Sequence, residues 1–148
     1  MRERTSIALT LATLTLIACR VTPSRNVSAS LEFATKNAIA GSEIKLLPLT
    51  DFAWSSFVAF GPYTTRQTAE QVLGFQWPSF DAFHLDSSDG FTLLVFLDGD
   101  RVVRVEELSR CAPDFSPAAL GRRLSPAEAV FTVRKEADCS VLDVRSAV

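Results

Sequence analysis

Residue types that carry enzymatic or metal-binding chemistry are scarce in this sequence. Its 148 residues include one histidine, one methionine, one tyrosine and three cysteines. It has no Gly-x-Ser-x-Gly nucleophile elbow, no P-loop and no Gly-x-Gly-x-x-Gly run. The acidic residues before Gly90 do not fit an EF-hand, because Leu85 occupies the position of the first liganding carboxylate. These absences argue against common nucleotide-dependent, calcium-binding and serine-hydrolase families.

Runs of one charge and long apolar runs are also missing. The formal net charge is −2, and no basic cluster interleaves with aromatic residues. The most extended apolar segment, residues 7–18, is shorter than the roughly 20 residues that a membrane-spanning helix needs. The sequence therefore predicts neither a nucleic-acid partner nor a transmembrane helix.

The first 18 residues have the organisation of a secretory signal peptide. Arg2 and Arg4 form a basic start, and residues 7–18 follow as a short apolar segment interrupted only by threonine. A small residue, Ala18, stands immediately before the first cysteine. This order predicts a segment that is removed from the mature protein.

The tetrapeptide Leu16-Ile17-Ala18-Cys19 resembles the lipobox of bacterial lipoproteins. The resemblance implies cleavage after Ala18 and attachment of lipid to Cys19. Two or more acyl chains hold a protein firmly in a membrane, so the resemblance predicts an anchor in the cell envelope. By similarity to sorted lipoproteins, Arg20 favours the outer membrane, facing the periplasm, in a Gram-negative host.

The residues after Arg20 predict one folded domain on a tether. All eleven phenylalanines, both tryptophans and the single tyrosine lie there, a density that argues against disorder. Residues 19–30 are rich in Ser, Thr, Pro and Asn, a composition typical of flexible linkers. We therefore expect a signal peptide over residues 1–18, a lipidated tether over 19–30 and a globular domain over 31–148.

Lipidation of Cys19 leaves Cys111 and Cys139 as an even pair. Outside the reducing cytosol we expect them to form a disulfide. In the chain-entropy estimate, closing a loop of this length raises the free energy of unfolding by about 3 to 4 kcal/mol. A metal pair and a redox thiol pair are the alternatives. Two cysteines with no nearby histidine supply too few ligands for a structural metal site, so we expect no metal and no cofactor.

Helix signals are strongest between residues 64 and 74. Thr64 and Gln67 form a capping-box pattern, and Gly74 stands where a C-terminal glycine cap belongs. Between them runs an apolar stripe at helical spacing: Ala69, Val72 and Leu73. Residues 31–40 mix helix and strand signals, and a helix is expected there before Gly41.

Strand signals dominate the rest of the chain. Phe91–Leu97 is continuously apolar, Asp98-Gly99 is a hairpin signal, and Arg101–Leu108 alternates valines with charges. Further strands are expected at residues 43–47, 52–60, 130–133 and 140–144, and short helical turns at 114–120 and 125–129. The predicted class is α+β: a mostly antiparallel sheet of about five strands with one or two packed helices, in a single domain.

Two resemblances reach beyond the signal segment. A set of short segments in the middle of the chain is similar to uncharacterised bacterial lipoproteins: Trp54, Gly61-Pro62-Tyr63-Thr64, Leu73-Gly74-Phe75, Leu94-Val95-Phe96, Asp98-Gly99 and Val102-Val103. The order of a helix ending in Leu73-Gly74 and a strand pair around Asp98-Gly99 also resembles outer-membrane assembly lipoproteins of the SmpA/OmlA type, with their β-lactamase-inhibitor-like fold. The second resemblance implies a protein-binding role.

Four aromatic residues around the predicted helix are candidates for contact with a partner: Trp54, Tyr63, Trp77 and Phe80. Exposed aromatic side chains often anchor protein interfaces, although burial in the core is the commoner fate of such residues. Trp77, in a loop before proline, is the first choice.

Catalytic candidates are weaker. His84 with Asp86 could act as a general base with an orienting carboxylate, but no nucleophile elbow accompanies them. Glu106 and Glu107 are neighbours on a predicted strand and so point to opposite faces. We therefore expect a lipid-anchored cell-envelope protein that is a non-enzymatic module binding a protein partner. A periplasmic inhibitor or immunity protein and an envelope hydrolase using His84 are the alternatives.

Overall fold

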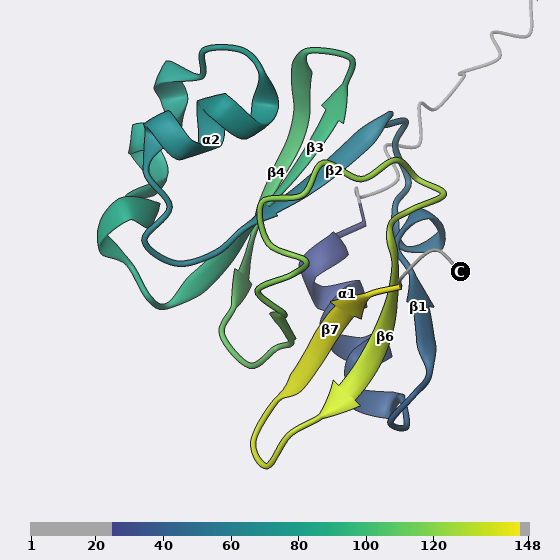
Figure 1. The fold of residues 1–148 in the computed structure, drawn as a ribbon. Coiled ribbons are helices and arrows are strands. Elements are labelled where there is room, and N and C mark those ends of the chain that lie inside the picture. Colours follow the sequence, from purple (N-terminus) through teal and green to yellow (C-terminus); the bar gives the residue numbers. More distant parts are fainter. Residues whose placement is uncertain (1–24, 146–148) are drawn as a thin grey trace, which may run out of the picture.

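The computed structural model describes residues 25–145, which form two β-sheets and two α-helices (Figure 1). The expected signal peptide, Cys19 and residues 19–24 of the expected tether lie outside the described residues. One sheet has the strand order β2-β3-β4, with bounds Ser56–Phe60, Phe91–Asp98 and Arg101–Ser109. The other has the order β1-β6-β7-β5, with bounds Glu43–Lys45, Val130–Lys135, Ser140–Val144 and Asp114–Phe115.

The α+β class, the single domain and the mostly antiparallel strand pairing are confirmed, but the expectation of one sheet of about five strands is wrong. The strands divide into two sheets, and the second is mixed because β5 and β7 run parallel. β3 is buried on both faces, so each face needs a cover, and the second sheet supplies one of them. The parallel pair follows from the disulfide, which joins residues just ahead of both strands, Cys111 and Cys139, with their Cα atoms 4.7 Å apart.

The main core lies between the two sheets. Phe57 of β2 contacts Phe96 of β3, Phe115 of β5 and Phe131 of β6, with ring centroids 5.1, 6.0 and 6.3 Å away. Rings at these separations combine a large buried apolar area with favourable edge and offset geometries. These rings pack with other buried residues, among them Leu94 of β3 and Leu31 of α1 (Val27–Asn37). We call the whole cluster between the sheets the inter-sheet core.

A second core lies on the other face of β2 and β3. Side chains of alternate parity from these strands pack there against α2 (Arg66–Leu73), which lies on the side away from β6 and β7 (Figure 1). Ala69 and Leu73, two members of the predicted stripe, are buried in it. Because side chains point alternately to the two faces of a sheet, β2 and β3 contribute residues to both cores.

α1 (Val27–Asn37) begins inside the expected tether, so the predicted boundary at residue 30 is wrong. The Asn26 side chain accepts a hydrogen bond of 2.8 Å from the Ala29 N–H and caps the helix. Val27 and Leu31 are completely buried. Long-range burial of these two side chains outweighs the polar composition that suggested a linker.

α2 confirms the predicted helix but begins one residue later than its capping pattern suggested. Thr65 is the N-cap and accepts from the Thr68 N–H, whereas the Thr64 hydroxyl donates to the carbonyl of Gly61. Gly74 caps the C-terminus at φ +80°, a conformation that glycine adopts without steric cost.

The β3–β4 hairpin is also confirmed, with its two-residue turn at Gly99-Asp100 rather than Asp98-Gly99. Three 3₁₀ helices connect the other elements: η1 Leu47–Leu49, η2 Pro78–Phe83 and η3 Leu85–Ser87. Single turns begin at Ser116 and Ser125, where each carbonyl accepts a hydrogen bond from three residues further on. Residues 114–115 form the strand β5, so the prediction of a helical turn over 114–120 is wrong at its start. The Ser116 N–H bonds the carbonyl of Leu142 in β7, which continues the pairing of β5 with β7.

Candidate functional site

The structure separates the four aromatic candidates into buried and accessible residues. Trp54 is 7% exposed, packs edge-on against Phe96, and its indole N–H donates to the Thr50 hydroxyl over 3.0 Å. Phe80 is 1% exposed. Both are core residues, so the hypothesis that either contacts a partner is wrong.

Trp77 is half-buried and belongs to a packed aromatic group. Its ring lies 5.5 Å from Phe80 and 5.7 Å from Phe83, and its backbone N–H donates to the Glu70 carboxylate. Most of what the indole contacts is therefore internal. Less of Trp77 than of Tyr63 is therefore accessible to a partner.

Tyr63 is the accessible aromatic candidate, with 61% of its surface exposed. Its backbone has φ +61°, a left-handed conformation that is rare for residues other than glycine. Its N–H donates to the carbonyl of Leu85 at 2.8 Å and is also 3.3 Å from that of Ser88. These bonds to the first residue of η3 and to the residue after this helix hold the tyrosine in a conformation that its own sterics disfavour.

Tyr63 borders a cleft of about 440 Å³ where the two sheets meet, which we call the Tyr63 cleft. Its apolar lining comes from the residues after β2, from β5 and β7, and from the turn after β5: Pro62, Phe115, Pro117, Leu120 and Val141. The turn sits close to β2 because residue 61 is glycine. A Cβ at Gly61 would lie 2.7 Å from a methyl carbon of Leu120, too close for any other residue without a shift.

Arg110 lines the Tyr63 cleft. Its guanidinium donates through Nε and Nη2 to the two carboxylate oxygens of Asp114, at 3.0 and 3.2 Å. The third nitrogen, Nη1, reaches the carbonyl of Asp89 at 3.4 Å. The hydrogen bonds and charge of Asp114 raise the pKa of Arg110 above its ordinary value.

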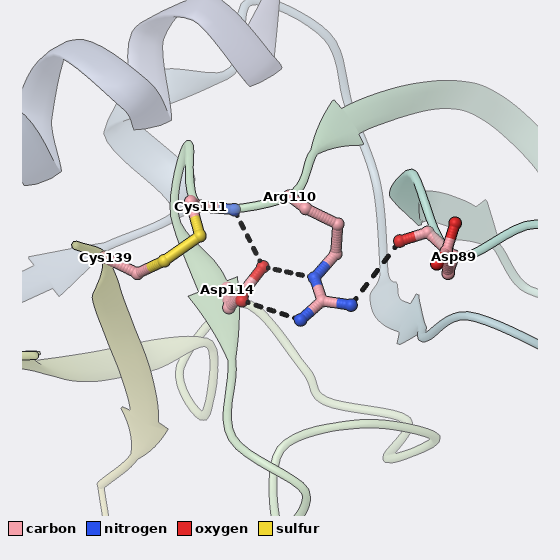
Figure 2. The surroundings of a disulfide bond; sticks show 5 residues. All are labelled: Asp89, Arg110, Cys111, Asp114 and Cys139. Atoms are coloured by element: carbon pink, nitrogen blue, oxygen red, sulfur yellow. Dashed lines mark hydrogen bonds and ion pairs between the residues drawn. A yellow bond between two sulfur atoms is a disulfide. The ribbon is translucent and has the colours of Figure 1, made fainter.

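The disulfide lies next to Arg110 and shares a carboxylate partner with it. The Cys111 N–H donates to Asp114 Oδ1 at 3.0 Å, so one carboxylate joins the disulfide turn to Arg110 (Figure 2). Cys111 itself has φ +65°. The predicted pairing of Cys111 with Cys139 is present in the structure, and disulfide sulfurs are not the thiolates that bind metal ions.

Arg134 of β6 is the second arginine that lines the Tyr63 cleft. It donates to Asp143 of β7 at 3.0 Å and also pairs with Glu136. The bond from Arg134 lowers the pKa of Asp143 and raises that of Arg134. Both guanidinium groups of the cleft are thus bonded to carboxylates, an arrangement that favours an apolar or mixed ligand surface over a strongly anionic one.

The catalytic candidates do not assemble into a site. His84 is exposed at φ +52°, and no hydrogen bond within residues 25–145 involves its ring. Glu106 lies opposite Leu94 of the inter-sheet core, and Glu107 lies opposite Leu93 of the other core, so the two carboxylates point to opposite faces as predicted. Glu106 accepts from the Ser28 N–H at 2.8 Å and thereby joins β4 to the start of α1.

Sequence reasoning missed the residues that shape the cleft around Tyr63. Asp114 follows Cys111 by three residues, a spacing at which a carboxylate often accepts from the backbone of a turn, so a local signal existed for it. Leu120 and Arg134 come from distant segments and have no local signal of this kind.

No protein-family model, curated protein or solved structure matches the chain. None of the helices within residues 25–145 has the length and apolar character needed to cross a membrane.

Proposed function

We propose that this chain is a lipid-anchored cell-envelope protein that binds a protein partner through the Tyr63 cleft and has a non-enzymatic role. The anchor is Cys19 of the lipobox-like segment Leu16–Cys19, and in a Gram-negative host the domain faces the periplasm from the outer membrane. The lipid determines where the protein is located, and the cleft determines which partner it binds.

Tyr63 is the observation that carries the binding role. An exposed tyrosine supplies a large contact area with only two side-chain torsions to order, which makes it an efficient interface anchor. Here its left-handed backbone is maintained by two carbonyl acceptors from another segment. Strained backbone that the surrounding structure maintains is concentrated at functional sites.

The composition of the cleft supports a protein ligand. Apolar residues line it together with two arginines, Arg110 and Arg134, that are each bonded to a carboxylate. Protein interfaces commonly combine apolar contact area with charged, hydrogen-bonding groups. Because both arginines are already paired, shape and apolar contact are the main sources of affinity.

A photo-crosslinking amino acid at position 63, introduced into the full chain in cells, tests the partner. Position 47 is the matched control, because Leu47 is 51% exposed and follows β1, at the opposite edge of the four-stranded sheet from β5. We expect one adduct of discrete mass from position 63 and none from position 47. Equal yields at both positions, or no adduct at 63, would refute the binding role.

The partner identified by mass spectrometry is then tested with the purified proteins. Tyr63→Ala should weaken the dissociation constant by at least about tenfold, as expected for an interface anchor, and Leu47→Ala should leave it unchanged. An unchanged constant for Tyr63→Ala would exclude the cleft as the contact surface.

The anchor has an independent test. A Cys19→Ser variant should remain unprocessed and should not incorporate a fatty-acid probe, whereas the wild-type chain should be labelled. Labelling that persists in the variant would refute lipidation at Cys19 without bearing on the cleft.

A further inference from the structure

The disulfide between Cys111 and Cys139 opens onto a pocket of its own. This pocket has a volume of about 410 Å³, and both cysteines line it together with residues of α1 and of the turn between β6 and β7. Cys111 is exposed and Cys139 is half-buried. We call it the disulfide pocket. A disulfide that solvent reaches is open to attack by a thiolate, so access separates exchangeable bonds from purely structural ones.

The disulfide pocket contains lysines that are not neutralised by ion pairs. Lys36 and Lys135 line it, and neither pairs with a carboxylate within residues 25–145. Lys135 Nζ donates to the Thr35 carbonyl at 2.7 Å and to the Ser140 hydroxyl at 3.0 Å, which holds it beside the residue that follows Cys139. A positive charge in this place stabilises a thiolate. The pocket is not a general anion site, because it also holds three acidic residues: Glu32, Glu136 and Asp138.

The disulfide pocket shares residues with the Tyr63 cleft. Arg110 and Glu136 line both. Asp114 accepts a hydrogen bond from the Cys111 N–H at 3.0 Å and two from the Arg110 guanidinium at 3.0 and 3.2 Å (Figure 2). One carboxylate therefore transmits a change in the backbone of Cys111 to a residue of the cleft.

The backbone pairing between β5 and β7 is short. The two strands pair over two residues each, and the Ser116 N–H adds one hydrogen bond to the Leu142 carbonyl. Phe115 of β5 and Val141 of β7 both line the Tyr63 cleft. The disulfide joins the segments just ahead of these strands, so breaking it frees both segments at once. The edge that depends most on the disulfide is thus one side of the cleft.

We propose that the Cys111–Cys139 disulfide is a thiol–disulfide exchange site for a dithiol, and that its reduction rearranges the Tyr63 cleft. The oxidised form has the cleft described above. The reduced form releases the β5–β7 edge while the three-stranded sheet stays folded. The exchange does not depend on what the cleft binds, and only its effect on a partner rests on the proposed function.

The reaction transfers two electrons from the dithiol to the protein. A thiolate of the dithiol attacks Sγ of the exposed Cys111, and the bond to Cys139 breaks with its electron pair going to the Cys139 sulfur. The second thiolate of the dithiol then attacks the dithiol's own sulfur in this mixed disulfide, and the dithiol leaves as a cyclic disulfide. The two protons of the dithiol end on Cys111 and Cys139, so no other reactant is needed.

Reduction kinetics under native conditions test the exchange. The full chain in detergent is incubated with dithiothreitol, and free thiols are alkylated and located by peptide mass, which separates the pair from Cys19. We expect wild type and Phe96→Ala to react at equal rates, because solvent reaches the bond without unfolding. Reduction through global unfolding would be at least about a hundredfold faster in Phe96→Ala, which lacks a central core ring, and that result would overturn the proposal.

A protein dithiol is tested beside the small one. Reduced thioredoxin is supplied at the same thiol concentration as dithiothreitol. Reduction by either supports the exchange, and the faster reagent shows whether the pocket favours a small or a protein dithiol. A disulfide that neither reagent reduces in the folded chain would refute the exchange site.

Tyr63 reports on the cleft, because it is the only tyrosine in the chain. Fluorotyrosine in the full chain therefore gives one fluorine resonance from the border of the cleft. We expect reduction to replace this resonance by one at another chemical shift and reoxidation to restore it. The double variant Cys111→Ser with Cys139→Ser is the control and should show the reduced-form resonance with or without dithiothreitol. A resonance that does not respond to reduction would exclude control of the cleft.

Two measurements complete the test. The amides of Val58 and Val95 should stay protected from hydrogen exchange after reduction, and loss of that protection would mean that the disulfide is a structural link for the whole domain. The photo-crosslink from position 63 should fall in yield in the double cysteine variant. An unchanged yield there would contradict the effect on the partner, whereas no adduct in wild type would bear on the proposed binding role alone.

Discussion

The two sheets are stabilised in different ways. In the three-stranded sheet, β3 contributes six consecutive buried residues, Thr92–Leu97, and apolar side chains cover both of its faces. In the four-stranded sheet, the outer strands are very short, the disulfide joins the segments that precede β5 and β7, and Arg134 with Asp143 joins β6 to β7. Burial stabilises the first sheet, whereas covalent and charged links hold the edge that forms the Tyr63 cleft.

Phe96→Ala should produce the largest effect, because it removes the ring at the centre of the inter-sheet core. We expect a loss of about 3 to 5 kcal/mol in the free energy of unfolding, measured by denaturant titration. Phe91→Ala, in the same strand but half-buried at its end, is the matched control and should cost clearly less. Equal losses would contradict a stability concentrated in the middle of β3.

Replacing Cys111 and Cys139 together by serine should cost about 3 to 4 kcal/mol. Its local effect should be confined to the four-stranded sheet. Hydrogen exchange should accelerate more at the Ser116 N–H, which bonds Leu142, than at the paired β2 and β3 amides of Val58 and Val95, which are protected up to the free energy of global unfolding. Equal acceleration in both sheets would mean that the disulfide has no additional local effect at the β5–β7 edge.

Arg123→Ala tests a polar link within the otherwise apolar three-stranded region. Its guanidinium donates to the Ser56 hydroxyl at 2.9 Å, to the Leu73 carbonyl at 3.0 Å and to the Gly99 carbonyl at 2.7 Å. These bonds join β2, the end of α2 and the β3–β4 hairpin. Hydrogen bonds from a charged donor predict a loss of about 2 kcal/mol, measured by chemical denaturation.

Arg122→Ala is the control for Arg123, because Arg122 is an exposed arginine at the adjacent position. A change within about 0.5 kcal/mol is expected for it. A similar loss in both variants would indicate an effect of net charge instead of the three hydrogen bonds.

The smallest expected effect is a pH dependence at the charged edge. Arg134 lowers the pKa of Asp143 in the folded protein, so the stabilisation is present above the pKa of an unfolded aspartate, about 3.9, and is lost as the pH falls through the lower folded value. Asp143→Asn should therefore lower the melting temperature at pH 7, and the difference from wild type should shrink below about pH 4. A difference that stays constant down to pH 2 would exclude the Asp143 carboxylate as its source.

Local signals predicted most elements of the fold. Alternating valines gave β4 to within a residue of its observed end, and Gly74 marked the end of α2. β5 was missed because it has only two residues and depends on β7 and the disulfide, more than twenty residues away along the chain. The start of α1 was placed too late because its polar residues resemble a linker, and only burial of Val27 and Leu31 reveals the helix.

The candidate site could be predicted only in part. An aromatic residue gives the same local pattern whether it is buried or exposed, so the sequence alone did not decide which of Trp54, Phe80 and Tyr63 is accessible. Their different fates depend on distant partners: Phe96 covers Trp54, Phe60 covers Phe80, and Leu85 fixes the backbone of Tyr63 while its ring stays exposed.

The sequence by itself determined the α+β class, the β3–β4 hairpin, the C-terminal end of α2 and the even pair of Cys111 and Cys139. These features depend on residues within a few positions of one another or on a simple count. Only the tertiary structure decided the division into two sheets, the parallel pairing of β5 with β7 and the meeting of Tyr63, Arg110 and Arg134 at one cleft. These arrangements require the closure of long loops, whose entropic cost is repaid only when distant apolar surfaces are buried together.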